Sequence, residues 1–221
     1  LDLFNMKKNL IKRIYTSIAL FVLLFLMLIN NYALGYFLLV IAIYSILEFF
    51  NIMKLISEKN KIKQWFINLV FVFYIFTFCT FFLILSFFLH LKLLLFIILL
   101  TCVVSDIGGF VVGKFFQGPK LTKISPKKTI SGAIGSILFS SVFIFASISY
   151  FTKNVYPYIF MTGCIISISC QIGDLFFSFL KRKASLKDTG KFLPGHGGFL
   201  DRIDGILLGV PVGFIILLIT Y

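Results

Sequence analysis

Two pairs of oxygen-bearing side chains stand at helical spacing in the last third of the sequence. Asp174 and Ser178 are four residues apart, so on a helix they share one face. Asp201 and Asp204 are three residues apart and share a face for the same reason. Carboxylate and hydroxyl oxygens are hard ligands that suit Mg²⁺, which proteins usually hold by one or two carboxylates together with substrate phosphates. The two pairs are therefore candidate metal ligands.

The segment that joins these pairs is basic and rich in glycine. Residues 194–198 read Pro-Gly-His-Gly-Gly, a tight backbone path that brings amide groups close to an anion. Lysines and arginines flank this path, and such side chains clamp phosphates. Acids for a metal beside bases for phosphates are the equipment of phosphoryl or nucleotidyl transfer.

The elements that must position these groups are strongly apolar. Hydrophobic residues make up 60% of the chain and charged residues 13%, against about 25% charged in a typical soluble domain. Seven runs approach or exceed the roughly 20 residues that a transmembrane helix needs. These runs cover residues 14–29, 33–53, 65–89, 93–113, 130–151, 155–180 and 203–221. We therefore predict an all-α polytopic membrane bundle of about seven transmembrane helices, forming a single membrane domain over residues 1–221. The long run that begins at Trp65 is expected to break at His90 and Lys92.

Basic residues fall in alternate connections between these runs. If the N-terminus is cytoplasmic, nineteen of the 21 lysines and arginines lie inside, and Lys92 and Lys153 lie outside. Positive residues favour the cytoplasmic side of a membrane protein. We therefore expect a cytoplasmic N-terminus, cytoplasmic loops at 114–129 and 181–202, and an external C-terminus. The net charge of +13 then reflects orientation, and no nucleic-acid partner is expected.

Four of the eight acids lie within the predicted spans, with Asp204 at the start of the last one. Asp106 and Asp174 stand toward the cytoplasmic ends, where an acid usually faces a partner or a water-filled cavity. Glu48 stands near the inner end of its span, and we interpret it as reaching the membrane interface.

The last third of the chain carries a pattern that reads Ser178-x2-Lys181-Arg182-x4-Lys187-Asp188-x-Gly190-x3-Pro194-Gly195-His196-Gly197-Gly198-x2-Asp201-Arg202-x-Asp204. This pattern resembles the signature of the phosphatidate cytidylyltransferases, or CDP-diacylglycerol synthases. A second block resembles the same family and reads Ser105-Asp106-Ile107-Gly108-Gly109, Gly113-Lys114 and Ser125-Pro126-Lys127-Lys128-Thr129. The resemblance covers about residues 100–221, a catalytic core, whereas residues 1–90 match only as variable hydrophobic spans. Ile130 and Ser131 stand where the family commonly has tryptophan and glutamate.

The resemblance implies cytidylyl transfer from CTP to phosphatidate in phospholipid biosynthesis, with Mg²⁺ as cofactor. It implies a bacterial inner (plasma) membrane protein whose partners are CTP, phosphatidate and membrane lipids. The sequence is also compatible with a second cation and a homodimer. Two alternatives stay open: another CTP-using lipid enzyme such as a polyprenol kinase, and an ion-coupled transporter whose intramembrane acids bind ions.

The resemblance also implies roles for individual residues. The implied metal ligands are Asp174 and Asp201, followed by Ser178 and Asp204. The implied catalytic residues are Asp174, Asp201, Lys181, Arg182, His196 and Arg202. The implied substrate-binding residues are Asp106, Lys127, Lys128, Lys187, Asp188, Gly197 and Gly198. The alternative to each role is structural: acids capped by neighbouring helices, bases that only set topology, a solvated ion pair between Lys187 and Asp188, and a histidine that shapes its loop.

The predicted topology is testable by thiol labelling in intact cells. Cysteines introduced into loops 114–129 and 181–202 should resist a membrane-impermeant reagent, because these loops are expected to be cytoplasmic. A cysteine in a tag at the C-terminus should react. Labelling of loop 181–202 from outside would overturn this topology.

Overall fold

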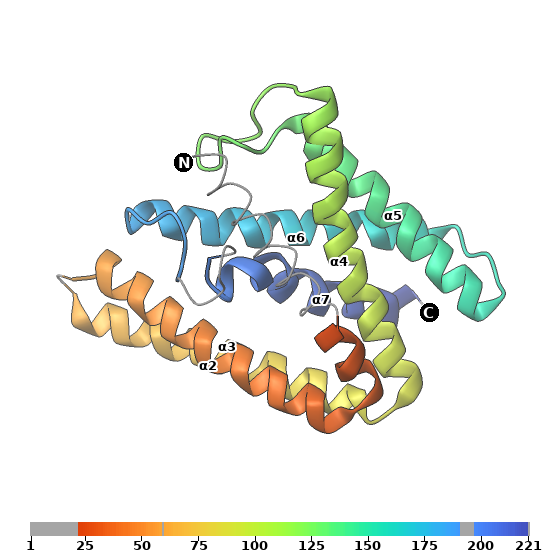
Figure 1. Cartoon of the computed structure of the whole chain (residues 1–221), viewed down its shortest axis with the longest axis horizontal. Coiled ribbons are helices and arrows are strands. Elements are labelled where there is room, and N and C mark those ends of the chain that lie inside the picture. Colours follow the sequence, from red (N-terminus) through yellow and green to blue (C-terminus); the bar gives the residue numbers. More distant parts are fainter. Residues whose placement is uncertain (1–21, 59, 191–196, 221) are drawn as a thin grey trace, which may run out of the picture. The chain divides into compact units, whose positions relative to one another are not determined.

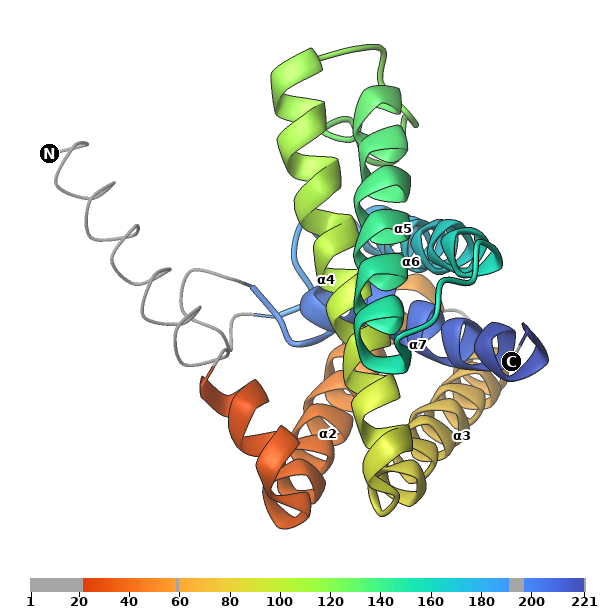
Figure 2. The same ribbon diagram turned by 90° about the vertical axis from the view of Figure 1, so that its right-hand side faces the viewer.

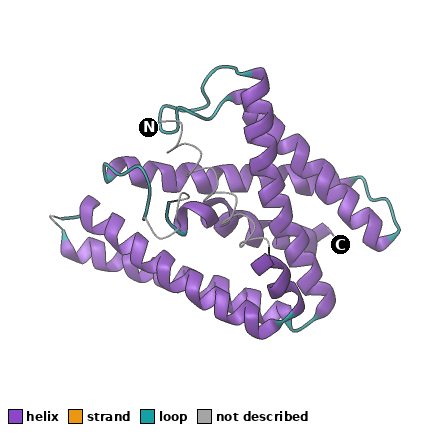
Figure 3. Ribbon diagram, in the orientation of Figure 1, coloured by secondary structure: helices purple, strands orange, loops and turns teal. Residues whose placement is uncertain are grey.

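The computed structural model describes residues 22–58, 60–190 and 197–220. Within these residues the chain is helical apart from short connections and one isolated bridge between Lys120 and Thr129 (Figure 3). The helices are α2 (Asn31–Ile56), α3 (Lys61–Ser86), α4 (Leu89–Phe116), α5 (Ile130–Thr152), α6 (Tyr158–Lys183) and α7 (Leu200–Thr220). All six are long and apolar enough to cross a membrane. The protein is therefore an all-helical integral membrane protein, as the sequence predicts.

The predicted spans coincide with these helices within a few residues at each end. Residues 22–29 are also helical and overlap the end of the first predicted span, 14–29, whose remainder lies outside the described residues. The predicted break at His90 and Lys92 is misplaced, because α3 ends at Ser86 and α4 begins at Leu89.

Lys92 is charged but does not lie in the connection between α3 and α4. Its side chain is buried, and its Nζ donates a hydrogen bond to Asn31 Oδ1 over 2.6 Å. A buried ammonium group is tolerated where a polar acceptor meets it. Lys92 therefore belongs to the first turn of α4 rather than to a connecting loop.

The chain forms two compact units, which are described one at a time. The first contains Leu1–Lys92 and Lys181–Arg202, and the second contains Leu93–Leu180 and Ile203–Tyr221. In the first unit α2 and α3 run antiparallel and side by side, joined by a short connection (Figure 1). The rings of Phe49 and Phe71 stack between them with centroids 3.8 Å apart. This packing supplies the scaffold on which Glu48 of α2 is held.

In the second unit, α4 and α5 lie side by side because glycines line their contact (Figure 2). A Cβ atom built on Gly132 would lie 2.8 Å from the carbonyl oxygen of Gly109, closer than real Cβ contacts allow. Gly113 also faces Gly132 at close range. Small residues at such contacts let transmembrane helices approach closely, and van der Waals packing then stabilises the pair.

Small residues also join α6 to its neighbours in the second unit. A Cβ atom on Gly173 would lie 2.5 Å from the carbonyl oxygen of Asp204 in α7. The hydroxyl groups of Ser105 in α4 and Ser167 in α6 lie 2.7 Å apart, within hydrogen-bonding distance. These contacts bring the acid-bearing faces of α4 and α6 into one unit.

Candidate active site

The connection between α4 and α5 places two lysines directly before a helix. It folds back on itself, with Leu121 N donating to the carbonyl oxygen of Lys128 over 2.8 Å. Thr129 then caps α5, because its Oγ1 accepts a hydrogen bond from Gly132 N over 3.1 Å. Lys127 and Lys128 are thus held at the N-terminal end of α5, where free backbone amides favour negative charge.

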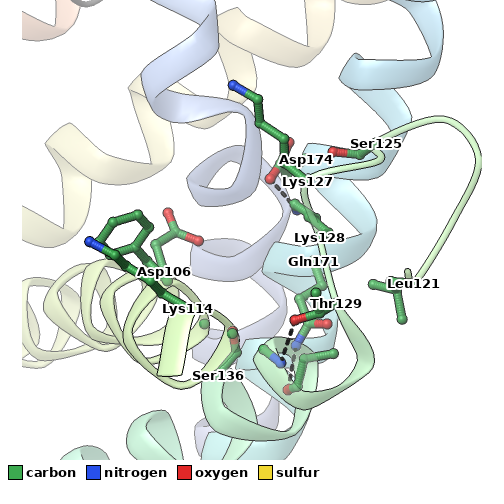
Figure 4. Close-up of a pocket in the computed structure, with 15 residues that line it drawn as sticks. Asp106, Lys114, Leu121, Ser125, Lys127, Lys128, Thr129, Ser136, Gln171 and Asp174 are labelled. Atoms are coloured by element: carbon green, nitrogen blue, oxygen red, sulfur yellow. Dashed lines mark hydrogen bonds and ion pairs between the residues drawn. The ribbon is translucent and has the colours of Figure 1, made fainter. Parts of the chain in front are cut away.

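A cavity of about 480 Å³ lies against this connection, within the second unit. Its polar lining consists of Asp106, Lys114, Ser125, Lys127, Lys128, Thr129, Ser136, Gln171 and Asp174. Figure 4 shows Asp106 and Lys114, from α4, across the cavity from Lys128 and Asp174. The volume falls in the range of small-molecule sites, about 300–1,000 Å³. Three lysines around one cavity favour an anionic ligand.

Asp174 has a partner on each carboxylate oxygen. Lys128 Nζ forms an ion pair with Oδ2, and the Ser178 hydroxyl donates to Oδ1 over 3.2 Å. The predicted common face of Asp174 and Ser178 on a helix is therefore confirmed. The Lys128 and Asp174 side chains keep 28% and 27% of their surface exposed, so a ligand in the cavity can reach both.

The donor set around Asp174 fits an Mg²⁺ ion that the protein and a substrate phosphate would bind together. The described residues contain no cluster of three or more histidines, cysteines or acids that could hold a metal without help. Mg²⁺ rarely needs such a cluster, because it keeps water and takes substrate phosphate oxygens beside one or two carboxylates. Asp174 with Ser178 supplies hard oxygen donors of that kind.

Asp201 lies in the first unit, where protein donors bind both of its oxygens. Lys181 Nζ lies 2.6 Å from Oδ1, with the two side chains only 11% and 9% exposed. Oδ2 accepts hydrogen bonds from Thr189 N over 2.8 Å and Gly198 N over 3.2 Å. The Gly198 amide thus donates to a carboxylate of the protein itself, that of Asp201. Asp174 belongs to the other unit, so shared metal binding by Asp174 and Asp201 stays a prediction.

Comparison with known proteins identifies the family. The family model described as the cytidylyltransferase family matches residues 1–220. The chain belongs to the cytidylyltransferase family. This confirms the resemblance seen in the sequence, and the match extends through the N-terminal spans that the signature does not reach.

Curated relatives in several bacteria are named phosphatidate cytidylyltransferase. The phosphatidate cytidylyltransferase of Rickettsia felis is 43% identical over 130 residues, covering 54% of this chain and 57% of the relative. That of a Helicobacter pylori strain is 41% identical over 113 residues, covering 51% and 42%. That of Aquifex aeolicus is 36% identical over 115 residues, covering 52% and 43%. The chain therefore spans about half the length of the curated relatives it matches.

The departure from the usual family sequence after Thr129 has a local structural account. Ser131 Oγ lies 3.1 Å from Thr129 Oγ1, and it donates to the carbonyl oxygen of Gln117 over 3.4 Å. Ile130 is 43% exposed. In this member of the family, Ser131 therefore ties the start of α5 to the preceding connection.

The remaining predicted residues differ in their surroundings. Asp204 is buried, and its Oδ1 accepts a hydrogen bond from Gly205 N over 2.9 Å. Arg182 donates to the carbonyl oxygen of Leu186 over 3.3 Å, which helps to close the end of α6. Gly197 adopts a left-handed backbone conformation with φ of 82°, which favours glycine. His196 lies outside the described residues.

Three charged residues of the predicted site lie open to solvent around loop 181–202. Lys187, Asp188 and Arg202 are exposed. The roles of Lys187 and Asp188, in substrate binding or as a solvated pair, therefore stay predictions.

Sequence reasoning missed several groups that the structure brings forward. Lys114 and Gln171 line the cavity, although only Lys114 stood in a recognised block. Glu48 was interpreted as reaching the membrane interface, but its side chain is only 6% exposed and is hydrogen-bonded within the first unit. An acid in an otherwise apolar span was the available signal for Glu48.

Replacement of Lys128 by methionine should weaken the binding of CTP, the nucleotide implied by the family resemblance. A charged hydrogen bond contributes about 1.5–3 kcal/mol, so affinity should fall roughly 10- to 100-fold. The thermal midpoint should change little, because the Lys128–Asp174 pair is partly exposed. Binding of labelled CTP to the purified protein measures the effect.

Lys123→Met provides the matched control, because Lys123 lies in the same connection, is exposed and does not line the cavity. It should bind CTP within about twofold of the unaltered protein. Equal losses in both variants would mean that general loop charge, and not the position of Lys128, attracts the nucleotide.

Proposed function

We propose that this protein transfers the cytidylyl group of CTP to phosphatidate, producing CDP-diacylglycerol and pyrophosphate in phospholipid biosynthesis. The observation that carries the proposal is the cavity in the second unit, where Lys114, Lys127 and Lys128 gather around Asp106 and Asp174. The names of the relatives in Rickettsia felis and Helicobacter pylori support the choice of substrates.

The proposed reaction is a substitution at phosphorus. A phosphate oxygen of phosphatidate attacks the α-phosphorus of CTP and forms the new P–O bond. The bond between the α-phosphorus and the oxygen bridging to the β-phosphorus breaks, and pyrophosphate leaves with that oxygen and the bonding electrons. Negative charge grows on the leaving oxygens, so cations held there stabilise the transition state. No covalent intermediate with the protein is needed.

The cavity residues have distinct tasks in this proposal. Lys127, Lys128 and the first amides of α5 bind the triphosphate, aided by the cap that Thr129 makes on α5. Lys128 exchanges Asp174 for a phosphate oxygen when CTP binds, which leaves the Asp174 carboxylate free for a metal. Asp106 orients the nucleotide from the opposite wall.

Mg²⁺ is the proposed cofactor. Asp174 and Ser178 would hold it in the second unit, and Asp201 and Asp204 are further ligands implied by the family signature. When bound, Mg²⁺ would neutralise the developing charge on the phosphates. This assignment rests on the chemistry of the donors around Asp174.

The proposed location is the bacterial inner membrane, with the active site on the cytoplasmic face. Phosphatidate resides in the bilayer and CTP in the cytosol, so the reaction must occur where the two phases meet. The concentration of lysines and arginines in loops 114–129 and 181–202 supports a cytoplasmic position for these segments.

Purified protein in detergent or vesicles should convert labelled CTP and phosphatidate to CDP-diacylglycerol and pyrophosphate. ATP should substitute poorly as the nucleotide donor. Chromatography of the lipid product and release of labelled pyrophosphate measure the two halves of the reaction. Phosphorylation of a lipid alcohol without cytidylyl transfer would contradict the proposal and indicate a kinase.

Replacement of Asp174 or Asp201 by asparagine should lower kcat by about 100-fold or more, since each change removes a charge assigned to metal binding. The shape of the side chain is retained, so both variants should still insert, although Asp201→Asn leaves the buried Lys181 without its ion-pair partner and should lower the thermal midpoint. A titration of activity against Mg²⁺ should show a raised requirement wherever activity remains measurable.

Glu58→Gln is the control for loss of a single negative charge, because Glu58 is exposed in the connection after α2. It should show normal Mg²⁺ dependence. Near-normal activity of Asp174→Asn or Asp201→Asn at low Mg²⁺ would exclude that residue as a metal ligand.

A further inference from the structure

Glu48 is a buried acid in the apolar helix α2, and nothing in the proposed chemistry uses it. Its side chain is 6% exposed. Burial of a carboxylate away from water costs several kcal/mol unless hydrogen-bond donors replace the lost water. The first unit contains such donors, and all of them come from residues at or next to the family signature.

Three donors from distant parts of the chain meet the Glu48 carboxylate. Its Oε2 accepts hydrogen bonds from the Thr189 hydroxyl over 2.7 Å and from Leu200 N over 2.9 Å. Its Oε1 accepts one from Phe199 N over 3.1 Å. Leu200 is the first residue of α7, where backbone amides have no partner within the helix. Glu48 therefore caps α7 from another helix.

The same donors lead directly to Asp201. Thr189 N donates to Asp201 Oδ2 over 2.8 Å, and the Thr189 hydroxyl lies 3.0 Å from the same oxygen. Asp201 is also the second residue of α7, so a fixed start of α7 fixes its backbone. Through Thr189 and the first turn of α7, Glu48 thus holds the carboxylate that pairs with Lys181.

Packing around Glu48 explains two glycines of the signature. A Cβ atom on Gly190 would overlap Glu48 Oε1, and one on Gly198 would lie 2.5 Å from Oε2. Tyr44, one turn before Glu48 on α2, stacks on Phe199 with ring centroids 5.2 Å apart. The loop is therefore shaped to receive α2, and Glu48 is the polar centre of that contact.

We infer that Glu48 is a positioning residue for the reaction proposed above: without touching substrate, it fixes Thr189 and the start of α7 and so orients Asp201 and Lys181. The inference rests on the proposed function for its effect on catalysis. The contact itself has consequences that can be measured without activity.

The first test is kinetic and uses Glu48→Gln. Glutamine keeps the shape, but its amide N–H₂ faces backbone donors where a carboxylate oxygen accepted hydrogen bonds. Partners that orient a catalytic ligand typically change activity by about 10- to 100-fold. We expect kcat to fall by that factor while KM for CTP changes less than about threefold. Glu58→Gln, which alters an exposed acid just beyond α2, should leave both constants unchanged.

Thr189→Val separates positioning from general damage to the fold. If Glu48 acts through Thr189, the double variant should be little worse than Glu48→Gln alone, because coupled residues are not additive. Independent, multiplying losses would overturn the inference. So would a wild-type kcat in Glu48→Gln, or a loss that only follows the fraction of unfolded protein seen in a thermal melt.

The second test is hydrogen exchange and needs no turnover. Glu48→Gln should speed exchange of the Phe199 and Leu200 amides, which lose their acceptor, whereas Glu58→Gln should not. Unchanged exchange at both amides would overturn the contact. If the wild-type protein shows no cytidylyl transfer, the proposed function is overturned instead. The exchange result alone then decides whether Glu48 holds the start of α7.

Discussion

A negative charge inside an apolar helix must be met by donors, and this requirement organises both units of the protein. Asp174 is met by Lys128 and Ser178, and Asp201 by Lys181 together with backbone amides. Glu48 is met by the hydroxyl of Thr189 and by two backbone amides. Removal of one partner from a buried pair typically costs about 3–5 kcal/mol, because a charge is left without compensation. The connecting segments are therefore held against the helices by the acids they satisfy.

The two acid–lysine pairs differ in exposure. Lys128 and Asp174 keep about a quarter of their surface open along a cavity, whereas Lys181 and Asp201 keep about a tenth. An accessible pair can exchange a partner for a ligand at low cost, since water already solvates it in part. A buried pair whose oxygens all have donors must give up more of those contacts before it can take a ligand. In this structure, Lys128 and Asp174 are therefore the pair that a ligand in the cavity reaches directly.

Glycines in both units leave room where a backbone or a carboxylate approaches closely. Gly109 and Gly132 allow α4 and α5 to pack closely beside the cavity. Gly190 and Gly198 leave room for the Glu48 carboxylate. Close packing against Glu48 therefore accounts for Gly190 and Gly198 of the signature, while amides presented to a phosphate stay a prediction from the sequence. The Gly198 amide does bind an anion, but that anion is Asp201 of the protein itself.

Hydropathy and helical spacing alone determined the helical class, the approximate spans and the common face of Asp174 and Ser178. These properties are local: they depend on composition over about 20 residues or on neighbours four apart. Only the tertiary structure decided that Lys128, rather than the adjacent Lys127, meets Asp174, and that Lys92 is buried against Asn31. It also decided the role of Glu48, whose partners lie 141 to 152 residues away. Such pairing depends on where the folded backbone brings distant groups together, and no local pattern in the sequence carries that information.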